Sequence, residues 1–411
     1  MLTLDYLPTP AERNIAIHLH PAAERNIKSG HPWLYESGIA RQSKSGQAGD
    51  IAVLFDRKRR FLAVGLYDPD SPIRVKILHH HDPATINQAF FESRLRAAIQ
   101  HRAPLAQTET TGYRLVYGES DSLPGLILDR YADTLVLKLY TRAWLPHLRA
   151  VRAALQAVYS FQRLVLRLSR GMQADASYGL YDGQMLAGTV PDAPLRFMEN
   201  GLHFQADVIH GHKTGFFFDQ RDNRARVAQY AKGHSALDVF AYNGGFSVYA
   251  ASGGAERVLS LDISEPALLD AQANMRLNHD RPAVAACQHT IMVADAFDGL
   301  QALAADGQQF GLVVVDPPAF AKSQSDVDGA LAAYRRLTQR ALKVIAPAGT
   351  LVMASCSSRV PADDFFAIVH ETAAQAGSPL HEIERTQHAL DHPLRDTFPE
   401  GAYLKCLFAR V

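Results

Sequence analysis

The stretch Ala236-Leu-Asp-Val-Phe-Ala-Tyr-Asn-Gly-Gly-Phe246 is the first of five segments that together decide the fold of this chain. The other four are Leu261-Asp-Ile-Ser264, Ala294-Asp-Ala-Phe297, Val315-Asp-Pro-Pro-Ala-Phe320 and Ala354-Ser-Cys-Ser-Ser358. In each of them an acidic residue or a cysteine closes a strand-like apolar run. Because the carboxyl ends of parallel strands meet at one edge of an open sheet, where ligands bind, we expect these residues to form one site.

Strand and helix patterns alternate from Leu195 onward. Residues 258–262, 311–316 and 349–355 are nearly continuous apolar runs, as strands buried on both faces require. Residues 265–278 and 329–345 have the spacing of helices. The alternation predicts an α/β fold in which residues 193–411 form a Rossmann-like, doubly wound domain.

The composition is that of a globular protein with more than one domain. A chain of 411 residues is too long for one ordinary core, and its 47% apolar and 20% charged residues are typical values. No apolar run approaches the ~20 residues of a membrane span. The first residues lack the pattern of a signal peptide, and three cysteines are too few for a disulfide framework. We therefore expect a cytoplasmic protein without a membrane partner.

Two smaller domains are expected before the α/β domain. Short strand-like runs at 51–55, 61–67 and 74–78 favour a small β-rich domain within residues 1–82, and residues 83–192 mix helical and strand patterns in a central α+β domain. The third predicted domain spans 193–411. Arg57 and Lys58 lie at the tip of a predicted hairpin, where they either contact RNA or blunt an exposed strand edge.

Net charge is zero, which by itself argues against a nucleic-acid binder. The charge is uneven, however. Residues 1–100 hold 13 Lys and Arg against 10 Asp and Glu, whereas residues 201–411 hold 18 against 23. A weakly basic front beside an acidic catalytic domain fits an RNA enzyme, although random scatter gives an excess of this size as well.

A glycine turn and two acids predict a nucleoside cofactor. Gly244 and Gly245 let the backbone approach a ligand, and their spacing is not that of a pyrophosphate-binding loop. Asp262 is placed to bind both ribose hydroxyls, and Asp295 to bind the adenine amino group. The alternative role for either acid is to cap the helix that follows it. The order of these groups favours S-adenosylmethionine.

Asp316-Pro-Pro-Ala-Phe320 predicts contact with a flat substrate. Two prolines stiffen the exit from the strand and hold the Asp316 carboxyl and the Phe320 ring in place. A carboxyl matches the donor and acceptor edge of a nucleobase. The alternative is a rigid turn without a ligand.

Cys356 ends a strand between hydroxyl residues, which favours a reactive thiol over a packing residue. A thiolate that adds to carbon 6 of a pyrimidine makes carbon 5 nucleophilic enough to accept a methyl group. We therefore predict Cys356 as the nucleophile and Asp316 as the acid that stabilises charge on the ring. The base that removes the carbon-5 proton is not identified. Cys287 and Cys406 are expected to be packing residues far from these motifs.

The segment from Gly211 to Arg224 mixes aromatic residues with polar ones and is placed to fold over the cofactor. The alternative is a hairpin that leads into a helix capped by Asp219. The residues predicted to bind the cofactor are Phe218, Gln220, Arg221, Asp238, Phe240, Tyr242, Asn243, Gly244, Gly245, Asp262, Ile263, Ser264, Asp295, Ala296, Asp316 and Pro317. Those predicted to contact the substrate are Pro318, Phe320, Lys322, Arg57 and Lys58. No metal site is predicted.

These motifs resemble those of the bacterial large-subunit ribosomal RNA (cytosine-5-)methyltransferases that carry an N-terminal PUA domain. The resemblance covers nearly the whole chain. It also includes Arg25-Asn-Ile-Lys-Ser-Gly-His-Pro-Trp-Leu-Tyr35, Gly118-Glu-Ser-Asp-Ser-Leu-Pro-Gly-Leu-Ile-Leu-Asp-Arg130, His210-Gly-His-Lys-Thr-Gly-Phe216 and Phe398-Pro-Glu-Gly-Ala-Tyr-Leu-Lys405. It implies a Rossmann-like methyltransferase domain behind an RNA-binding barrel, S-adenosylmethionine as donor, ribosomal RNA as partner and Cys356 as nucleophile.

One feature departs from many RNA 5-methylcytosine enzymes. They carry a second cysteine after the Asp-Pro motif, whereas Ala319 stands here, so Cys356 works alone or with a base that is not a thiol. Lys322 is placed either to contact substrate phosphate or to lie in a solvated loop.

Two other functions are compatible with the sequence. One is methylation of an exocyclic amine, because Asp-Pro-Pro with an aromatic residue also serves that chemistry and needs no thiol. The other is a non-catalytic RNA-binding or ribosome-assembly factor. The target nucleotide and the choice between naked RNA and an assembled subunit cannot be read from the sequence. A homodimer is the default expectation for the oligomeric state.

Overall fold

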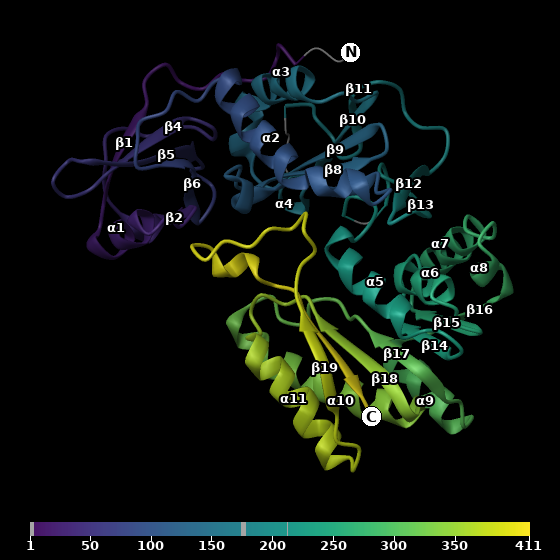
Figure 1. Cartoon of the computed structure of the whole chain (residues 1–411). Coiled ribbons are helices and arrows are strands. Elements are labelled where there is room, and N and C mark those ends of the chain that lie inside the picture. The colour runs from purple at the N-terminus through teal and green to yellow at the C-terminus, as the bar shows by residue number, and fades with distance from the viewer. Residues whose placement is uncertain (1–3, 174–177, 212) are drawn as a thin grey trace. The chain divides into compact units, whose positions relative to one another are not determined.

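The computed structural model describes residues 4–173, 178–211 and 213–411 (Figure 1). Within these ranges the chain forms two compact units. The first unit runs to Phe197 and includes Ala206–Phe218 and Asp391–Gly401, and the second holds Met198–Gln205, Asp219–Leu390 and Ala402–Val411. The described residues form four sheets, of six, five, two and seven strands. The division into domains at 82/83 and 192/193 stays a prediction.

The six-stranded sheet of the first unit has the order β2-β6-β5-β4-β1-β3, with one parallel pair, β1·β4. Apolar side chains at alternate positions of β1, Ile15, Ile17 and Leu19, are buried in its core. The predicted strands at 51–55, 61–67 and 74–78 are confirmed. The elements are β1 (Ile15–Leu19), α1 (Pro21–Lys28), β2 (Trp33–Tyr35), β3 (Ile39–Gln42), β4 (Ile51–Phe55), β5 (Phe61–Tyr67) and β6 (Ile73–His80).

The five-stranded sheet of the first unit has the order β11-β10-β9-β8-β7. Its β9 and β10 run parallel, because α3 connects them, and the other pairs are antiparallel. Trp144 is fully buried in the core that joins this sheet to α2 and α3. The elements are α2 (Gln88–Arg102), β7 (Gly112–Tyr117), η3 (Gly118–Asp121), β8 (Leu126–Tyr131), β9 (Thr134–Leu139), η4 (Arg142–His147), α3 (Leu148–Val158), β10 (Arg163–Leu168), α4 (Arg170–Gln173) and β11 (Gln184–Ala187).

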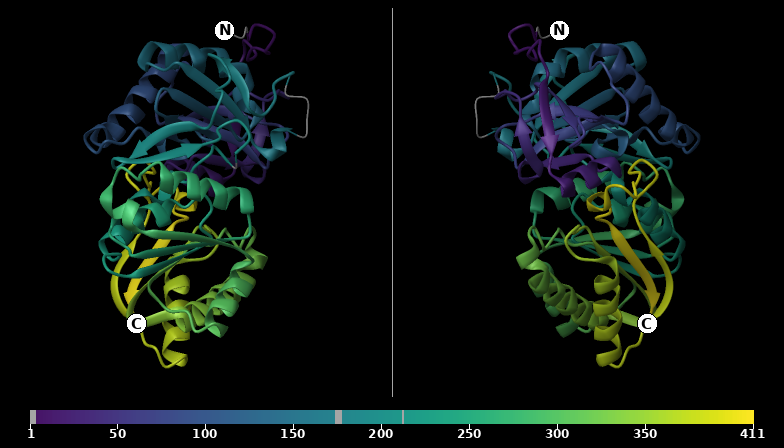
Figure 2. Two further views of the ribbon diagram at one scale, coloured as in Figure 1. Left: turned by 90° about the vertical axis from the view of Figure 1, so that its right-hand side faces the viewer. Right: turned by 90° about the vertical axis from the view of Figure 1, so that its left-hand side faces the viewer.

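The seven-stranded sheet of the second unit has the order β16-β15-β14-β17-β18-β20-β19, and helices cover both of its faces (Figure 2). The first five strands are parallel, and β20 runs antiparallel to both neighbours. Strands β14 and β17 are neighbours, although β15 and β16 lie between them in the chain. This is the switch point at which ligands bind in doubly wound sheets.

The predicted helices at 265–278 and 329–345 are confirmed as α7 and α10, and the predicted α/β fold is confirmed with them. The strands are β14 (Ser235–Val239), β15 (Arg257–Asp262), β16 (Gln288–Val293), β17 (Phe310–Val315), β18 (Ile345–Ser355), β19 (His381–Thr386) and β20 (Lys405–Arg410). The helices are α5 (Arg221–Gln229), α6 (Gly245–Ser252), α7 (Glu265–Arg276), α8 (Pro282–Ala286), α9 (Ala296–Ala305), α10 (Val327–Val344) and α11 (Ala362–Gln375). A short hairpin, β12 (Leu195–Glu199) and β13 (Leu202–Ala206), completes the list of strands. Among the described residues, no helix is long and apolar enough to cross a membrane.

Candidate active site

Four predicted residues lie at the carboxyl ends of neighbouring strands in the second unit. Asp238 is the second-to-last residue of β14, Asp262 ends β15, Asp316 follows β17 and Cys356 follows β18. The register pairs Asp238 with Ser260 and Val314, and Val315 with Met353, so these strand ends are adjacent. The sheet therefore brings the acids and the thiol to the same edge (Figure 1).

The loop after β14 has a strained backbone. Phe240, Tyr242 and Gly244 have φ angles of 65°, 48° and 75°, in the left-handed region that residues other than glycine rarely adopt. A Cβ atom on Gly244 would lie 2.7 Å from the Cβ of Ala271, so the close packing of this loop on α7 requires glycine. Asn243 lies in the same loop and is buried. Strain of this kind is concentrated at ligand sites, which agrees with the cofactor-binding role predicted for this loop.

Asp262 holds the loop against β15. Its two carboxylate oxygens accept hydrogen bonds from the backbone N–H groups of Tyr242 and Ser264, both at 2.9 Å. The Ser264 side chain, rather than Asp262, caps α7 by accepting from the N–H of Ala267. Ile263 is 72% exposed beside this carboxylate, which leaves an apolar surface next to a fixed acceptor. A ribose and its adenine fit that combination.

Asp238 is a buried acid with an unused acceptor. Its Oδ2 accepts from the N–H and the hydroxyl of Ser247, and its Oδ1 has no hydrogen-bond partner among the described residues. Burial raises the pKa of Asp238 to about 6, against hydrogen bonds from Ser247 that lower it. Because a nearby cation would favour the ionised form, the sulfonium and ammonium charges of S-adenosylmethionine suit this position.

Asp295 begins the next helix. Its Oδ1 accepts from the N–H of Phe297 and caps α9, and its side chain is exposed. The capping role given above as an alternative is therefore present for Asp295, and a contact with adenine remains a prediction. Ala296 is buried in the first turn of α9.

Among the acids at this strand edge, Asp316 has the pKa that is raised most. Burial, followed by the charge of Asp219, raises the pKa of Asp316 to about 7, against a hydrogen bond from the side chain of Gln220. Asn223 fixes Gln220 by donating to its Oε1 at 2.6 Å, and Thr386 donates in turn to Asn223. The Gln220 side chain therefore holds Asp316, in addition to the cofactor contact predicted for it.

Cys356 is partly exposed at the end of β18. Its Sγ lies 3.5 Å from the carbonyl oxygen of Pro317, so the thiol adjoins the Asp316 loop. The neighbouring hydroxyls point into the core, because Ser355 accepts from Tyr334 at 2.8 Å and Ser357 donates to Ala321 at 3.1 Å. The buried serines fix the backbone on both sides of the thiol.

Lys405 is a site residue that the sequence analysis missed. It is 3% exposed, and its ammonium donates to the carbonyl oxygens of Ser357, of Val360 at 2.7 Å and of Tyr403 at 3.2 Å. Burial lowers the pKa of Lys405 to about 8, against the charge of Cys356. A buried lysine thus ties together the loop that carries the thiol. The signal for it was a lysine at the start of the apolar run that ends the chain.

The expectation that Cys406 lies far from the motifs is wrong. Cys406 is in β20, which inserts between β18 and β19, and it pairs with Ala354. The antiparallel strand brings it two residues away from Cys356 in register. It is fully buried, and burial, followed by the charge of Asp316, raises its pKa well above the usual value, as suits a packing residue.

The start of α5 differs from the capping alternative. Gln220, not Asp219, occupies the N-cap position, and no side chain caps this helix. Asp219 Oδ2 instead accepts from the Tyr403 hydroxyl at 2.7 Å. Arg221 is 2% exposed and pairs with Asp222 at 3.0 Å, so the charge predicted to face the cofactor is held within the first turn.

Phe218 lies in the first unit. Its ring is 1% exposed and packs with Tyr131, Phe197 and Phe216 at centroid distances of 5.1–5.7 Å. Phe216 and Phe218 of the segment from 211 to 224 thus belong to one packed aromatic cluster.

The predicted substrate contacts lie in two places. Pro318 is exposed after the buried Pro317, Phe320 packs on Tyr334 at 5.3 Å, and the backbone of Lys322 is bonded to Asp326.

In the first unit, Arg57 and Lys58 lie in the hairpin turn between β4 and β5. Asp56 organises that turn, because its carboxylate accepts from the backbone N–H groups of Lys58 at 2.8 Å and Arg60 at 2.9 Å. Hydrogen bonds from Arg60 in turn lower the pKa of Asp56 to about 2. Arg57 itself is 69% exposed.

The fold is a doubly wound sheet with a strained glycine loop, and along one edge it carries an acid placed for ribose hydroxyls together with further acids. This combination defines a class I S-adenosylmethionine-dependent methyltransferase. Comparison with known proteins agrees. The family model described as S-adenosylmethionine-dependent methyltransferase matches residues 119–410, and a PUA-like domain model matches residues 17–80.

Among similar proteins, a ribosomal RNA large subunit methyltransferase of Deinococcus radiodurans is 42% identical over 98% of this chain and 99% of its own length. Ribosomal RNA large subunit methyltransferase I of Pseudoalteromonas translucida is 34% identical over 96% and 99%. This chain therefore belongs to the family of S-adenosylmethionine-dependent methyltransferases that includes these proteins. A Streptococcus mutans protein assigned as a S-adenosylmethionine-dependent methyltransferase has the same fold, with a TM-score of 0.80 at 21% identity over 96% of this chain and 100% of that one.

Proposed function

We propose that this protein methylates carbon 5 of a cytosine in large-subunit ribosomal RNA, with Cys356 as the covalent nucleophile. The observation that carries the proposal is a partly exposed thiol whose Sγ lies 3.5 Å from the Pro317 carbonyl, beside a carboxyl with a pKa of about 7. A methyltransferase acting on an oxygen or an amine needs no such thiol.

S-adenosylmethionine, when bound, supplies a methyl group on a positively charged sulfur. The thiolate of Cys356 adds to carbon 6 of the cytosine, which leaves carbon 5 as a nucleophile that takes the methyl group. Loss of the carbon-5 proton to a base and cleavage of the Sγ–C6 bond then release the RNA, which now carries 5-methylcytosine, and restore the thiolate. The base is not assigned.

Asp316 has a proton to share at neutral pH. Because burial raises its pKa to about 7, the carboxyl keeps a protonated population at neutral pH and can donate to the cytosine ring nitrogen as Sγ adds. Gln220 and Asn223 fix the carboxyl for this contact. Protein groups that are fixed before the reaction stabilise charge without reorganisation.

Lys405 supports the thiol in this proposal. Its ammonium holds the carbonyl groups of Ser357 and Val360, and its charge interacts with Cys356. A cation near a cysteine favours the thiolate, which is the reactive form. Lys405 is therefore a positioning residue that acts through Cys356.

The RNA substrate is inferred from the relatives and from the first unit. The similar proteins above are named ribosomal RNA large subunit methyltransferases, at 34–42% identity over nearly the full chain. The PUA-like match at 17–80 adds a second module, in keeping with an RNA of complex shape.

A second candidate is methylation of an exocyclic amine. It is favoured by Asp316-Pro317-Pro318, followed by an aromatic side chain, Phe320, since a carboxyl and an aromatic ring also suit an amino group on a flat base. This reaction proceeds without Cys356.

The experiment is nucleoside mass spectrometry of large-subunit ribosomal RNA from cells with and without the gene. Loss of one 5-methylcytidine is expected, and loss of a methylated amine instead would exclude the covalent role of Cys356. As a second test, RNA containing 5-fluorocytidine should trap the wild-type protein as a denaturation-resistant adduct, because fluorine cannot leave carbon 5 as a proton does. The Cys287→Ala protein should form the adduct and Cys356→Ala should not.

A further inference from the structure

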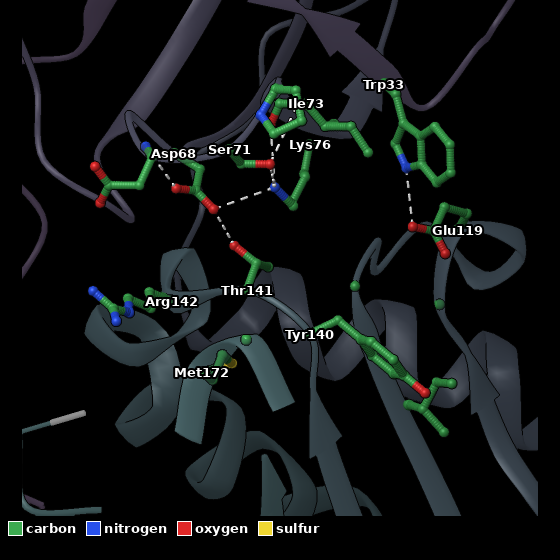
Figure 3. Close-up of a pocket in the computed structure, with 16 residues that line it drawn as sticks. Trp33, Asp68, Ser71, Ile73, Lys76, Glu119, Tyr140, Thr141, Arg142 and Met172 are labelled. Atoms are coloured by element: carbon green, nitrogen blue, oxygen red, sulfur yellow. Dashed lines mark hydrogen bonds and ion pairs between the residues drawn. The ribbon is translucent and has the colours of Figure 1, made fainter. Parts of the chain in front are cut away.

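The first unit contains a cavity of about 810 Å³ that the proposed reaction does not use (Figure 3). Its wall is built from two parts of the unit. Trp33, the turn from Asp68 to Ile73 and Lys76 come from the six-stranded sheet, and Glu119, Gly125 and Tyr140–Arg142 come from the second sheet and its turns. A volume of this size is in the range of small-molecule sites.

Buried polar contacts make the cavity rigid. Lys76 is 6% exposed and its ammonium lies 3.4 Å from Asp68 Oδ2 and 3.1 Å from the Ile73 carbonyl. The Thr141 hydroxyl donates to the same Asp68 oxygen, which ties the turn after β5 to the end of β9. Figure 3 shows this network among the residues that line the cavity. A wall that is already fixed loses little entropy when a ligand binds.

A second tie holds the opposite wall. The indole N–H of Trp33 donates to Glu119 Oε1 at 3.0 Å, and Phe398 packs on the Trp33 ring at 4.7 Å. Burial raises the pKa of Glu119, which increases its capacity to donate as well as accept a hydrogen bond. This wall therefore offers an aromatic surface and a carboxyl group.

Tyr140 is the exposed aromatic residue of the cavity. Its side chain is 49% exposed although it lies in a hollow, and the Lys138 ammonium is 5.6 Å from its ring centroid. Arg142 adds a second cation on the far side of Thr141 (Figure 3). An open ring with a cation beside it, a second cation beyond Thr141 and hydrogen-bonding groups in the wall are the parts that bind the base and phosphate of a nucleotide.

We propose that this cavity holds an unpaired nucleotide of the substrate RNA, with its base stacked on Tyr140 and its phosphate near Arg142. The inference rests on the proposed RNA substrate and deepens it, because it assigns a recognition site separate from the cytosine that is methylated. RNA proteins that recognise single strands stack splayed bases on aromatic side chains in this way.

The test measures RNA binding without S-adenosylmethionine, so that it does not depend on methyl transfer. The probe is deproteinised large-subunit ribosomal RNA from cells lacking the gene. We expect Tyr140→Ala to weaken binding about tenfold or more, which is the effect of losing the aromatic ring that stacks on one base, while Tyr140→Phe retains affinity. Tyr6→Ala is the matched control, because Tyr6 is also 49% exposed and does not line the cavity. Equal affinity of the Tyr140→Ala and Tyr6→Ala proteins would overturn the inference.

Crosslinking tests the wild-type protein directly and guards against a variant that fails to fold. Ultraviolet irradiation of the wild-type protein with the same RNA should yield nucleotide adducts on peptides that contain Trp33 or Tyr140. Adducts confined to other peptides would also overturn the inference. Failure of the proposed cytosine chemistry is separate, since 5-methylcytidine would then be unchanged when the gene is removed, while these binding results would still stand.

Discussion

The cavity of the first unit and the strand edge of the second differ in whether their buried charged groups have partners. In the cavity, Lys76 is paired with Asp68, and Trp33 donates to Glu119. At the strand edge, Asp238 keeps an unpartnered buried oxygen and has a pKa raised to about 6. Paired charges fix a shape that selects a ligand, whereas an uncompensated acid is a cost that a cationic ligand removes. The difference matches the roles proposed for the two places, which are RNA recognition in the cavity and methyl transfer at the strand edge.

The largest effect is expected at the strand edge, where replacing the Cys356 thiol should stop methyl transfer. Cys356→Ala should lower the rate of methyl transfer by about 10⁴-fold or more, since the covalent route is lost. RNA affinity and S-adenosylmethionine affinity should stay within about twofold. Single-turnover transfer of labelled methyl groups measures the rate. Cys287→Ala is the control, and substantial activity of Cys356→Ala would favour amine methylation.

Removing the ribose acceptor tests whether the strand edge is the cofactor site. Asp262→Ala should weaken S-adenosylmethionine binding on the order of a hundredfold or more, because two hydrogen bonds to a charged group are lost together with the tie to Tyr242. Titration calorimetry measures the affinity. Asp298→Asn, a change of an exposed acid in α9, should have no effect. Unchanged binding by Asp262→Ala would mean that the cofactor binds at another place.

The unpartnered acid should make stability depend on pH. Burial raises the folded-state pKa of Asp238 from 3.8 to about 6, so the protonated group is tolerated and stability falls as pH rises between these values. Asp238→Asn removes this loss, so its unfolding free energy relative to wild type should rise by about 3 kcal/mol between pH 3.5 and pH 7. Urea unfolding at several pH values measures it. Saturating S-adenosylmethionine should reduce the wild-type dependence, and a constant difference between the two proteins would contradict the assignment.

The buried lysine provides a smaller test on the same strand edge. Lys405→Met should slow alkylation of Cys356 by iodoacetamide at pH 7 about tenfold and shift its pH profile upward, because the thiolate loses a nearby cation. The measurement uses a Cys287→Ala background, since Cys406 is buried. Lys405→Arg should retain most of the reactivity. A lower rate with an unshifted pH profile would limit Lys405 to a structural role.

Local patterns were enough to predict the parallel strands and the residues that close them. The apolar runs ending at Asp262, Val315 and Ser355 can be buried on both faces only in a parallel sheet, so their ends had to meet. The site acids and Cys356 followed from that single rule. The PUA-like module was predicted through motif resemblance, because short strands carry a weak signal.

Partners supplied by distant strands could not be predicted. Lys405 and Cys406 reach the site because β20 inserts antiparallel between β18 and β19, and no local pattern specifies which strands pair. The bond from Tyr403 to Asp219 spans much of the sequence for the same reason. The capping role named as an alternative for Asp219 is not present, because its carboxylate accepts from this long-range hydroxyl instead.

The segment Asp391–Gly401 has a consequence for how this chain folds during its synthesis. It lies between β19 and β20, yet it belongs to the first unit, where Asp391 accepts from the backbone of Arg114 and from the Arg102 guanidinium. The N-terminal unit therefore lacks part of its own structure until almost the whole polypeptide has left the ribosome exit tunnel. Its synthesis cannot follow the usual order in which an early domain finishes folding before a later one begins. Fragments that stop before Asp391 should emerge with Arg102 short of acceptors, so dissecting the protein at a simple cut will leave the first half incomplete.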